Sequence, residues 1–375
     1  MKIYFVVLLS ILAFISCDRT IDPDIDPNID PNVDTIEIVE ELYFPPINDN
    51  EWETEDMDSL GWHSENVDEL YDFLEENNTR AFIVLKDGKI VIEEYWGQTI
   101  VGVGSFTETS QWYWASAGKT ITSSLVGIAQ EEGALDITDP SSMYLGEGWT
   151  SMESEKENLI TVRDQLSMTT GVDYTMGNTE CTEPECLNYK ADAGNQWFYH
   201  NATYTLLDGV IEGATGSTLQ EYTDEKISSV IGMNGEWIKL GSNNVYWSNA
   251  REMARFGLLI MNEGKWEETE VIADKTYYDQ MINTSQDLNP AYGYLWWLNG
   301  KNTIIYPTSP QIFNTKLAPQ APDDLIAALG KDGQFVDVLP SHNIVVIRMG
   351  QAPDESLVPT GFHDDMWGKI MDVIE

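Results

Sequence analysis

The stretch WYWASAGKTITSSLVGIAQEEG, residues 112–133, places a serine three residues ahead of a lysine at the start of a helical pattern. From Ser116 onward, apolar residues recur at helical spacing, and Gly133 is typical of a helix end. Residues three apart on a helix share a face, so the Lys119 side chain can reach the Ser116 hydroxyl. The stretch therefore predicts a helix that presents Ser116 and Lys119 together.

Ser116 and Lys119 have two interpretations when they are taken alone. A serine hydroxyl is a poor nucleophile unless another group takes its proton, and a lysine does so only when its amine is neutral. Desolvation favours the neutral amine, and Trp112 and Trp114 could supply dry surroundings. Equally, serine is a favoured helix cap, and so short a motif arises easily by chance. The pair is either a nucleophile with its base or a helix start.

Two later motifs favour the catalytic interpretation. QWFYHNATYTLLDGVIEGATG contains Tyr199 and Asn201, and LGKDGQFVDV contains Lys331 and Gly333 before a strand-like run. Ser-x-x-Lys, Tyr-x-Asn and Lys-x-Gly in this order resemble the motifs of the penicillin-recognising serine hydrolases. The chain resembles the class C β-lactamase family, which includes penicillin-binding-protein-like esterases, D-aminopeptidases and 6-aminohexanoate-oligomer hydrolases. The resemblance extends from about residue 61 to the C-terminus and includes ITVRDQLSMTTGVDY, WSNAREMARFGLLIMNEGKW and YGYLWWLNG.

The order of strand-like and helical segments predicts the fold class. Two β-rich runs in RAFIVLKDGKIVIEEYW, joined by Asp87-Gly88, indicate a hairpin near the N-terminal end. Three further strand-like runs follow at 325–350. Residues 136–290, between the N-terminal hairpin and these runs, carry helical patterns. We expect an α+β fold of the β-lactamase/transpeptidase kind. Its antiparallel sheet would combine N- and C-terminal strands, flanked by helices, with an inserted helical lobe.

The resemblance implies a role for each motif residue. Ser116 would attack a carbonyl and form an acyl-enzyme that water releases. Lys119 and Tyr199 would share the proton transfers, the pKa of the Tyr199 phenol being lowered by Lys119 and Lys331, and which of them is the base stays open. Asn201 would orient Lys119 or a substrate amide. Without the resemblance, Tyr199 could be a core aromatic, Asn201 a helix cap and Lys331 a turn residue.

The same resemblance implies an oxyanion hole. Its two donors would be the backbone N–H groups of Ser116 and Gln334, the residue after Lys-x-Gly. Gly333 would let the substrate approach the strand closely, because it has no side chain.

Asp332 departs from the family pattern. In the β-lactamases the middle residue of Lys-x-Gly is usually Thr or Ser, whose hydroxyl helps to hold the carboxylate of the drug. A carboxylate that faced the cleft would repel that anion, so neutral or cationic esters or amides would be preferred and β-lactams would be poor substrates. Neighbouring strand residues alternate in direction, so Asp332 could also point away.

Other functions stay open. The chain could be a catalytically inactive family member that serves as a cell-wall or ligand-binding module, or a true β-lactamase or D-amino-acid peptidase. A Ser-His-Asp site is disfavoured, because no Gly-x-Ser-x-Gly surrounds Ser116, although His200 lies inside Tyr-x-Asn. No metal or cofactor is expected, because neither His-x-x-x-His nor Cys-x-x-Cys occurs.

The net charge of the chain limits the classes of partner that it can bind. With 63 acidic and 20 basic residues, the formal net charge is -43 at pH 7. Such a charge repels phosphate backbones, so nucleic-acid binding is not expected. A small-molecule ester, amide or peptide is the expected partner, and the oligomeric state stays open.

The N-terminus predicts export. MKIYFVVLLSILAFISC has Lys2, an apolar run over 3–15 and a small residue before Cys17, as in a secretory signal. Its end resembles a bacterial lipobox, which would make 1–16 a lipoprotein signal peptide and Cys17 a lipid-anchored N-terminus, periplasmic or at the cell surface. An ordinary signal peptide is the alternative. Residues 17–50, with the repeat IDPDIDPNIDPNVDT, would form an acidic Pro-rich tether to a hydrolase domain over 51–375.

Two further cysteines, in CTEPEC, are candidates for a disulfide. In an exported protein, Cys181 and Cys186 could pair and pin a loop near the rim of the cleft, or could remain free thiols.

Overall fold

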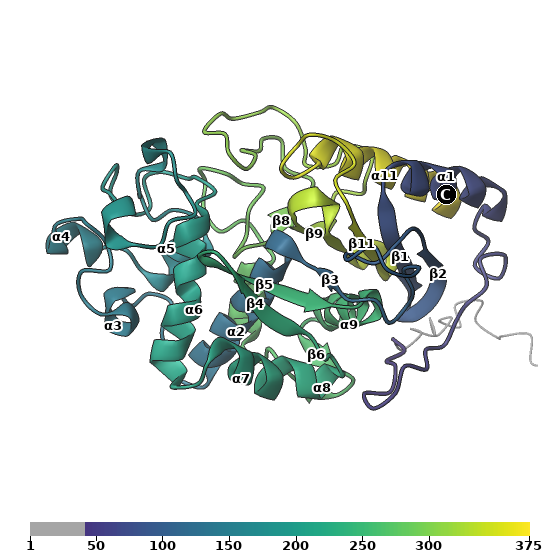
Figure 1. The fold of residues 1–375 in the computed structure, drawn as a ribbon, viewed down its shortest axis with the longest axis horizontal. Helices are drawn as coiled ribbons and strands as arrows, with labels where there is room; N and C mark the ends of the chain where they lie inside the picture. Colours follow the sequence, from purple (N-terminus) through teal and green to yellow (C-terminus); the bar gives the residue numbers. More distant parts are fainter. Residues whose placement is uncertain (1–41) are drawn as a thin grey trace, which may run out of the picture. The chain divides into compact units, whose positions relative to one another are not determined.

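A computed structural model describes residues 42–375, and the predicted signal peptide at 1–16, the predicted lipidation site Cys17 and most of the predicted tether lie outside the described residues. A six-stranded antiparallel sheet is the centre of the fold, in the order β2-β1-β11-β10-β9-β8 (Figure 1). Two strands come from the N-terminal part and four from the C-terminal part, which confirms the predicted α+β fold. The strands are β1 (Thr79–Lys86), β2 (Lys89–Tyr95), β8 (Trp297–Leu298), β9 (Ile326–Leu329), β10 (Phe335–Leu339) and β11 (Ile344–Gly350).

Helices cover both faces of this sheet. The helix α9 (Ala250–Met261) packs on β1, β10 and β11, while α1 (Val67–Glu76) and α11 (Thr360–Ile374) pack against each other. On β10, the ring of Phe335 stacks on Phe362 of α11, whereas a Cβ added to Gly257 of α9 would lie 3.2 Å from the next residue, Val336. Successive strand residues thus contact different helices, as strand geometry requires. Burial of both faces explains why β11 starts with four consecutive apolar residues, 344–347, rather than with an alternating pattern.

A helical lobe lies beside the sheet, as predicted. Its long helices, α2 (Lys119–Glu131) and α6 (Asn201–Thr215), pack together. The remaining helices are α3 (Ser142–Leu145), α4 (Ser154–Glu157), α5 (Val162–Leu166), α7 (Leu219–Thr223), α8 (Ser229–Ile231) and α10 (Lys275–Met281). The first eleven residues of α2 are all buried, so α2 is a central helix rather than an amphipathic surface helix. Among its buried polar residues, the Thr120 hydroxyl donates to the Ala117 carbonyl at 2.7 Å.

The region 136–290 also contains strands, which the helical pattern did not predict. A second sheet has the order β3-β5-β4, from β3 (Trp112–Tyr113), β4 (Glu236–Leu240) and β5 (Asn243–Ser248). A short hairpin joins β6 (Lys265–Trp266) and β7 (Thr269–Glu270). The β4–β5 turn contains Gly241 at φ +65°, a conformation that glycine adopts readily.

The folded domain begins before residue 51, although we expected the boundary between the tether and the domain at that residue. The ring of Phe44 packs edge-on against Trp266 with ring centroids 5.0 Å apart. The buried guanidinium of Arg255 donates to the backbone carbonyls of Pro46 and Asp49 at 2.8 and 3.1 Å. The Asp-Pro repeat ends earlier, so these residues belong to the domain rather than to the tether. Within the described residues, no helix has the length and apolar character needed to cross a membrane.

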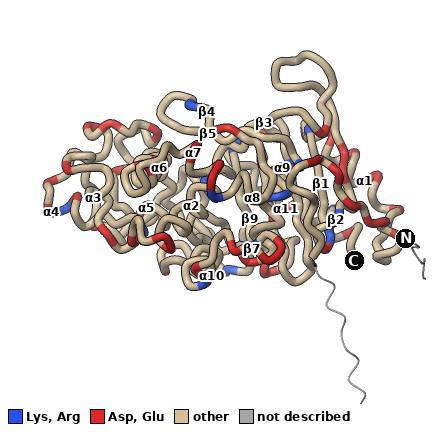
Figure 2. Tube along the Cα trace, turned by 90° about the horizontal axis from the view of Figure 1, so that it is seen from below, with Lys and Arg blue, Asp and Glu red and all other residues tan. Residues whose placement is uncertain are grey.

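Acidic residues are distributed over most of the elements in the described part of the chain, and Lys and Arg are few (Figure 2). The surface charge therefore does not by itself point to one binding site.

Candidate active site

Ser116 lies in a 3₁₀ turn, η2 (Ala115–Gly118), directly before α2, rather than in the helix itself. The preceding Ala115 has φ +48°, the left-handed region in which residues other than glycine are strained. Trp114 fixes the turn, because its indole N–H donates to Ser248 of β5 at 2.8 Å and its backbone N–H to the Tyr246 carbonyl at 2.8 Å. Backbone strain held by its surroundings is common at active sites, and here it lies next to the predicted nucleophile.

The structure brings most of the predicted site residues to one cavity of about 580 Å³. The predicted residues that line it come from η2, α2, the start of α6 and the turn between β9 and β10. They are Ser116, Lys119, Tyr199, Asn201, Lys331 and Asp332. A concave site in which polar groups converge on an apolar lining is the usual form of a small-molecule site.

Lys119 has the environment of a general base. Its side chain is buried, with Nζ 3.7 Å from the ring centroid of Tyr204 and 5.4 Å from that of Tyr199. Burial lowers the pKa of Lys119 to about 7, although the carboxylates of Glu180 and Asp208 oppose this shift. A large fraction of the amine is then neutral near pH 7 and able to accept the Ser116 proton.

Tyr199 does not have the lowered pKa that we predicted. Burial raises the pKa of its phenol above the ordinary value, and Glu180 adds to this, while a hydrogen bond with Ser116 acts in the opposite direction. The expectation considered the charges of the neighbouring lysines and neglected desolvation, which disfavours a buried phenolate. Tyr199 is therefore protonated at neutral pH, which favours Lys119 as the base and Tyr199 as a proton donor.

Asn201 begins α6, and its amide contacts a residue that the sequence analysis missed. Its Nδ2 donates to Oε1 of Glu180 at 2.6 Å, rather than orienting Lys119. Its Oδ1 is buried and has no hydrogen-bond partner within residues 42–375. That free acceptor leaves a substrate N–H as the second expected role of Asn201.

Only part of the third motif lies where we expected it, because Lys331 lines the cavity but the following glycine and glutamine do not. Lys331–Gly333 forms a 3₁₀ turn between β9 and β10, and neither Gly333 nor Gln334 lines the cavity. A Cβ on Gly333 would meet the guanidinium of Arg348 at 2.4 Å, so this glycine packs against the protein and not against a substrate. The Gln334 side chain instead exchanges two hydrogen bonds with the backbone of Gly350.

A different glycine, Gly330, makes a close approach at this site, and it does so to the nucleophile turn rather than to a substrate. A Cβ added to it would lie 2.5 Å from the carbonyl oxygen of Trp114 and 3.1 Å from the backbone nitrogen of Ala117. Only glycine at the end of β9 allows this contact with the nucleophile turn. The backbone N–H of Lys331, the next residue, thus replaces that of Gln334 as the partner of the Ser116 N–H in a candidate oxyanion hole.

Asp332 faces the cavity. This is the orientation in which we expected its carboxylate to repel an anionic substrate. It lines the cavity at φ +63°, and its carboxylate accepts a hydrogen bond from the Tyr113 hydroxyl at 2.8 Å.

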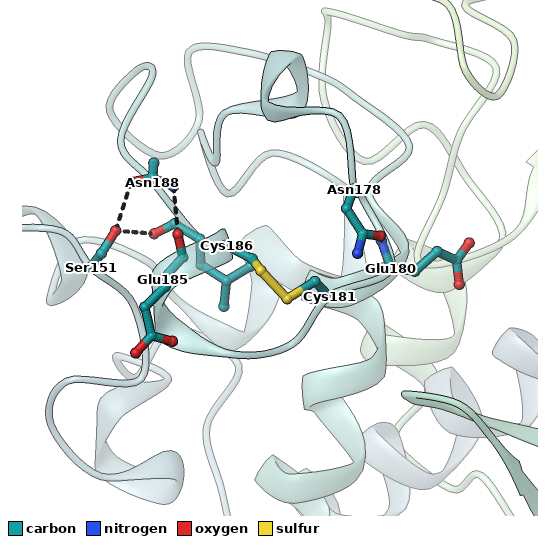
Figure 3. Close-up of a disulfide and its surroundings, with 8 residues drawn as sticks. Ser151, Asn178, Glu180, Cys181, Glu185, Cys186 and Asn188 are labelled. Atoms are coloured by element: carbon teal, nitrogen blue, oxygen red, sulfur yellow. Dashed lines mark hydrogen bonds between the residues drawn. A yellow bond between two sulfur atoms is a disulfide. The ribbon is translucent and has the colours of Figure 1, made fainter.

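Cys181 and Cys186 form a disulfide (Figure 3). Glu180 precedes this disulfide, and its carboxylate points away from it in Figure 3. Glu180 lines the cavity and also accepts a hydrogen bond from Nδ2 of Asn243 on β5. One feature of the sequence pointed to Glu180: it is an acidic residue directly before a cysteine that could form a disulfide.

The histidine and metal alternatives gain no support. His200 is buried, burial lowers its pKa to about 4, and it does not line the cavity with Ser116. His363 lies in the core, where its Nε2 is 2.7 Å from a carboxylate oxygen of Asp337. In the described part of the chain, no group of three or more His, Cys, Asp or Glu side chains could hold a metal ion.

Comparisons with known proteins identify a family and several similar structures. The Beta-lactamase family model matches residues 74–359, and no curated protein matches the sequence. A candidate 6-aminohexanoate-dimer hydrolase from Bacillus anthracis has a similar structure, with a TM-score of 0.65 and 19% identity over 88% of this chain and 89% of that one. A candidate β-lactamase from Bacteroides dorei DSM 17855 has a TM-score of 0.63 and 16% identity, over 83% of this chain and 98% of that one. An octameric penicillin-binding-protein homologue from Pyrococcus abyssi has a TM-score of 0.60 and 17% identity, over 82% of this chain and 77% of that one. At these identities the similarity to solved structures concerns the fold.

Proposed function

Since this chain belongs to the beta-lactamase family, we propose that it is a serine hydrolase that cleaves an ester or amide through an acyl-enzyme on Ser116. One observation carries the proposal: a buried lysine with a pKa of about 7 lies one turn from a serine at the wall of a cavity. A purely structural lysine gains nothing from such a position, because burial penalises its charged form.

The proposed reaction follows from the protonation states of the three residues. Neutral Lys119 takes the Ser116 proton while Oγ forms a bond to the substrate carbonyl carbon. The N–H groups of Ser116 and Lys331 hold the resulting oxyanion. When this intermediate collapses, the bond to the leaving group breaks, and the Tyr199 phenol passes a proton to that group and regains one from protonated Lys119.

Deacylation repeats these steps with water. Neutral Lys119 takes a proton from water as its oxygen attacks the acyl carbon, and the bond to Ser116 Oγ then breaks with return of a proton to Oγ. The net reaction consumes one water and releases an acid with an alcohol or amine. Hydrolysis of p-nitrophenyl butyrate by the full chain tests the proposal; an absence of turnover would favour the binding-module alternative.

Asp332 supports a preference for substrates without a carboxylate near the reacting carbonyl. Its charge would repel the anionic carboxylate of a β-lactam, so we expect poor turnover of nitrocefin. Replacement by asparagine, which can still accept the Tyr113 hydrogen bond, should raise kcat/KM for nitrocefin relative to p-nitrophenyl butyrate by about fivefold, the effect of roughly 1 kcal/mol of like-charge repulsion.

Steady-state kinetics with both substrates checks this prediction. Asp72→Asn on α1 is the matched control, because Asp72 is exposed and does not line the cavity. Efficient nitrocefin turnover by the unaltered chain, or an unchanged ratio in Asp332→Asn, would contradict it.

We also propose export and lipid anchoring at Cys17, from the N-terminal sequence alone. The mature protein would then start at Cys17, carry a diacylated sulfur and be held at a membrane on the outer side. Mass spectrometry of the N-terminal peptide from the native host checks this, and an unmodified Cys17 would overturn the anchor.

A further inference from the structure

We propose that an exposed apolar loop at the mouth of the catalytic cavity binds an uncharged aliphatic chain of the substrate, so that this hydrolase prefers long-chain esters. The inference rests on the proposed function and specifies its substrate class. The loop lies between β2 and β3, and its exposed aliphatic residues, Ile100, Val101 and Val103, form what we call the apolar tip.

The loop that carries the apolar tip is closed by hydrogen bonds and anchored in the core. The Thr99 hydroxyl donates to the Val103 carbonyl at 2.7 Å and accepts from the Val103 backbone N–H at 3.3 Å. The backbone N–H of Phe106 donates to the Gly97 carbonyl at 3.0 Å, and the buried Phe106 ring packs edge-on against Trp112. The outward position of the tip is therefore fixed by the fold.

The side chains of the tip are largely exposed to water. Val101 and Val103 are 76% and 75% exposed, and Ile100 is 44% exposed. Single exposed aliphatic residues are common on protein surfaces, whereas three among four consecutive residues form an apolar patch. Burial of such a patch against another apolar group is favourable. The tip thus suits an apolar ligand.

The tip continues the wall of the catalytic cavity. Ile100 lines the same cavity as Ser116, and so does Leu357, which is 42% exposed. Because Ile100 belongs to both the cavity and the tip, a chain that leaves the cavity past Ile100 reaches Val101 and Val103. A ligand of the tip can therefore be part of a substrate whose reacting carbonyl lies at Ser116.

Charge decides which kind of chain fits this end of the cavity. The backbone N–H of Asp332 donates to the Leu357 carbonyl at 3.4 Å, so an aliphatic residue and an anion-repelling carboxylate lie side by side. Residues 100–103 contain no charged or polar side chain. A charged end group would lose hydration at the tip without gaining a hydrogen bond from these side chains. An uncharged alkyl chain meets both conditions.

The tip could instead contact a second copy of this chain or a lipid surface. The three occupants differ in their consequences for the reaction. A tip that binds the substrate chain changes the hydrolysis of dissolved long-chain esters, whereas contact with a second copy changes the oligomeric state. Contact with a lipid surface changes the hydrolysis of aggregated esters only. We commit to the substrate chain because the tip and the cavity share Ile100.

Two pairs of esters that differ in chain length test the proposal. The pair p-nitrophenyl butyrate and p-nitrophenyl decanoate varies the acyl part, and the pair butyl acetate and decyl acetate varies the alcohol part. Each is used below the concentration at which the long ester aggregates. We expect the full chain to prefer the long member of at least one pair by about tenfold in kcat/KM, which corresponds to the burial of about two further methylene groups.

Replacement of both Val101 and Val103 by serine should reduce this preference by about fivefold, because the tip loses most of its apolar surface. Replacement of both by leucine should retain it, because the tip stays apolar. Ile312→Ser is the matched control, since Ile312 is also an exposed aliphatic residue but does not line the cavity. It should keep the preference of the unaltered chain.

Three results would overturn this role of the tip while leaving the hydrolase intact. The first is no preference in either pair, or an equal preference in the serine variant. The second is a preference that appears only once the long ester aggregates, which would assign the tip to a lipid surface. The third is a dimer in analytical ultracentrifugation that dissociates in the serine variant while the preference is unchanged. Failure to hydrolyse any of the four esters would overturn the proposed function itself.

Discussion

Replacement of Ser116 by alanine should reduce kcat/KM for p-nitrophenyl butyrate by about 10⁴-fold or more, the range found when a nucleophile that acts together with its base is removed. The variant keeps the cavity and Lys119 but has no oxygen that can form the acyl-enzyme. Because the Ser116 side chain is small and partly exposed, the fold should be unaffected.

Initial rates measured for the full chain and for the variant check this result. Ser154→Ala is the control, an exposed serine on α4 that does not line the cavity, and it should hydrolyse the ester at the unaltered rate. Equal rates for the full chain and for Ser116→Ala would rule out Ser116 as the nucleophile.

Replacement of Lys119 by methionine should have the second largest effect, a loss of about 10³-fold in kcat/KM, because it removes the base but not the nucleophile. The unaltered chain should show kcat/KM rising with pH through about 7, as Lys119 loses its proton. This rise should be absent from the residual activity of Lys119→Met. A profile of kcat/KM between pH 5 and 9 separates the cases, and a variant that retains both the rate and the rise would exclude Lys119 as the base.

The same variant should be more stable at pH 7, by about 1–3 kcal/mol. Lys119 has an ordinary pKa of 10.5 when exposed and about 7 in the fold. The folded chain thus binds fewer protons than the unfolded chain between these values, so its stability falls as the pH decreases from about 10.5 to about 7. Methionine lacks this penalty. Thermal unfolding at pH 7 and 9 measures it, with Lys265→Met, an exposed lysine, as control.

Local signals made much of the fold predictable from sequence. The β1–β2 hairpin follows from two β-rich runs around Asp87-Gly88, and the C-terminal strands follow from their mostly apolar, valine- and isoleucine-rich runs. The β4–β5 hairpin was missed because its residues are mostly exposed or half-buried and carry no clear alternation of apolar and polar residues. Its role as a cavity wall depends on pairing with β3, which is about 130 residues away in sequence.

The site divides in the same way. Ser116, Lys119 and Tyr199 belong to short motifs, and the structure gathers them at one cavity. The glycine of the third motif was assigned wrongly. Lys-x-Gly matches the family motif in sequence, but the tertiary contact with the nucleophile turn is made by Gly330. Burial, which sets the direction of the pKa shift of Tyr199, cannot be read from a motif. For Glu180 the neighbouring cysteine was the one signal in the sequence, and it was too weak to assign a role, because only the folded loop brings Glu180 to Asn201.

Covalent labelling tests the acyl-enzyme most directly. The full chain is treated with a fluorophosphonate, and its intact mass and tryptic peptides are measured beside those of Ser116→Ala. The account predicts one adduct per chain, located on Ser116 and absent from the variant. No adduct on the full chain, or an adduct on another residue that persists in Ser116→Ala, would contradict it.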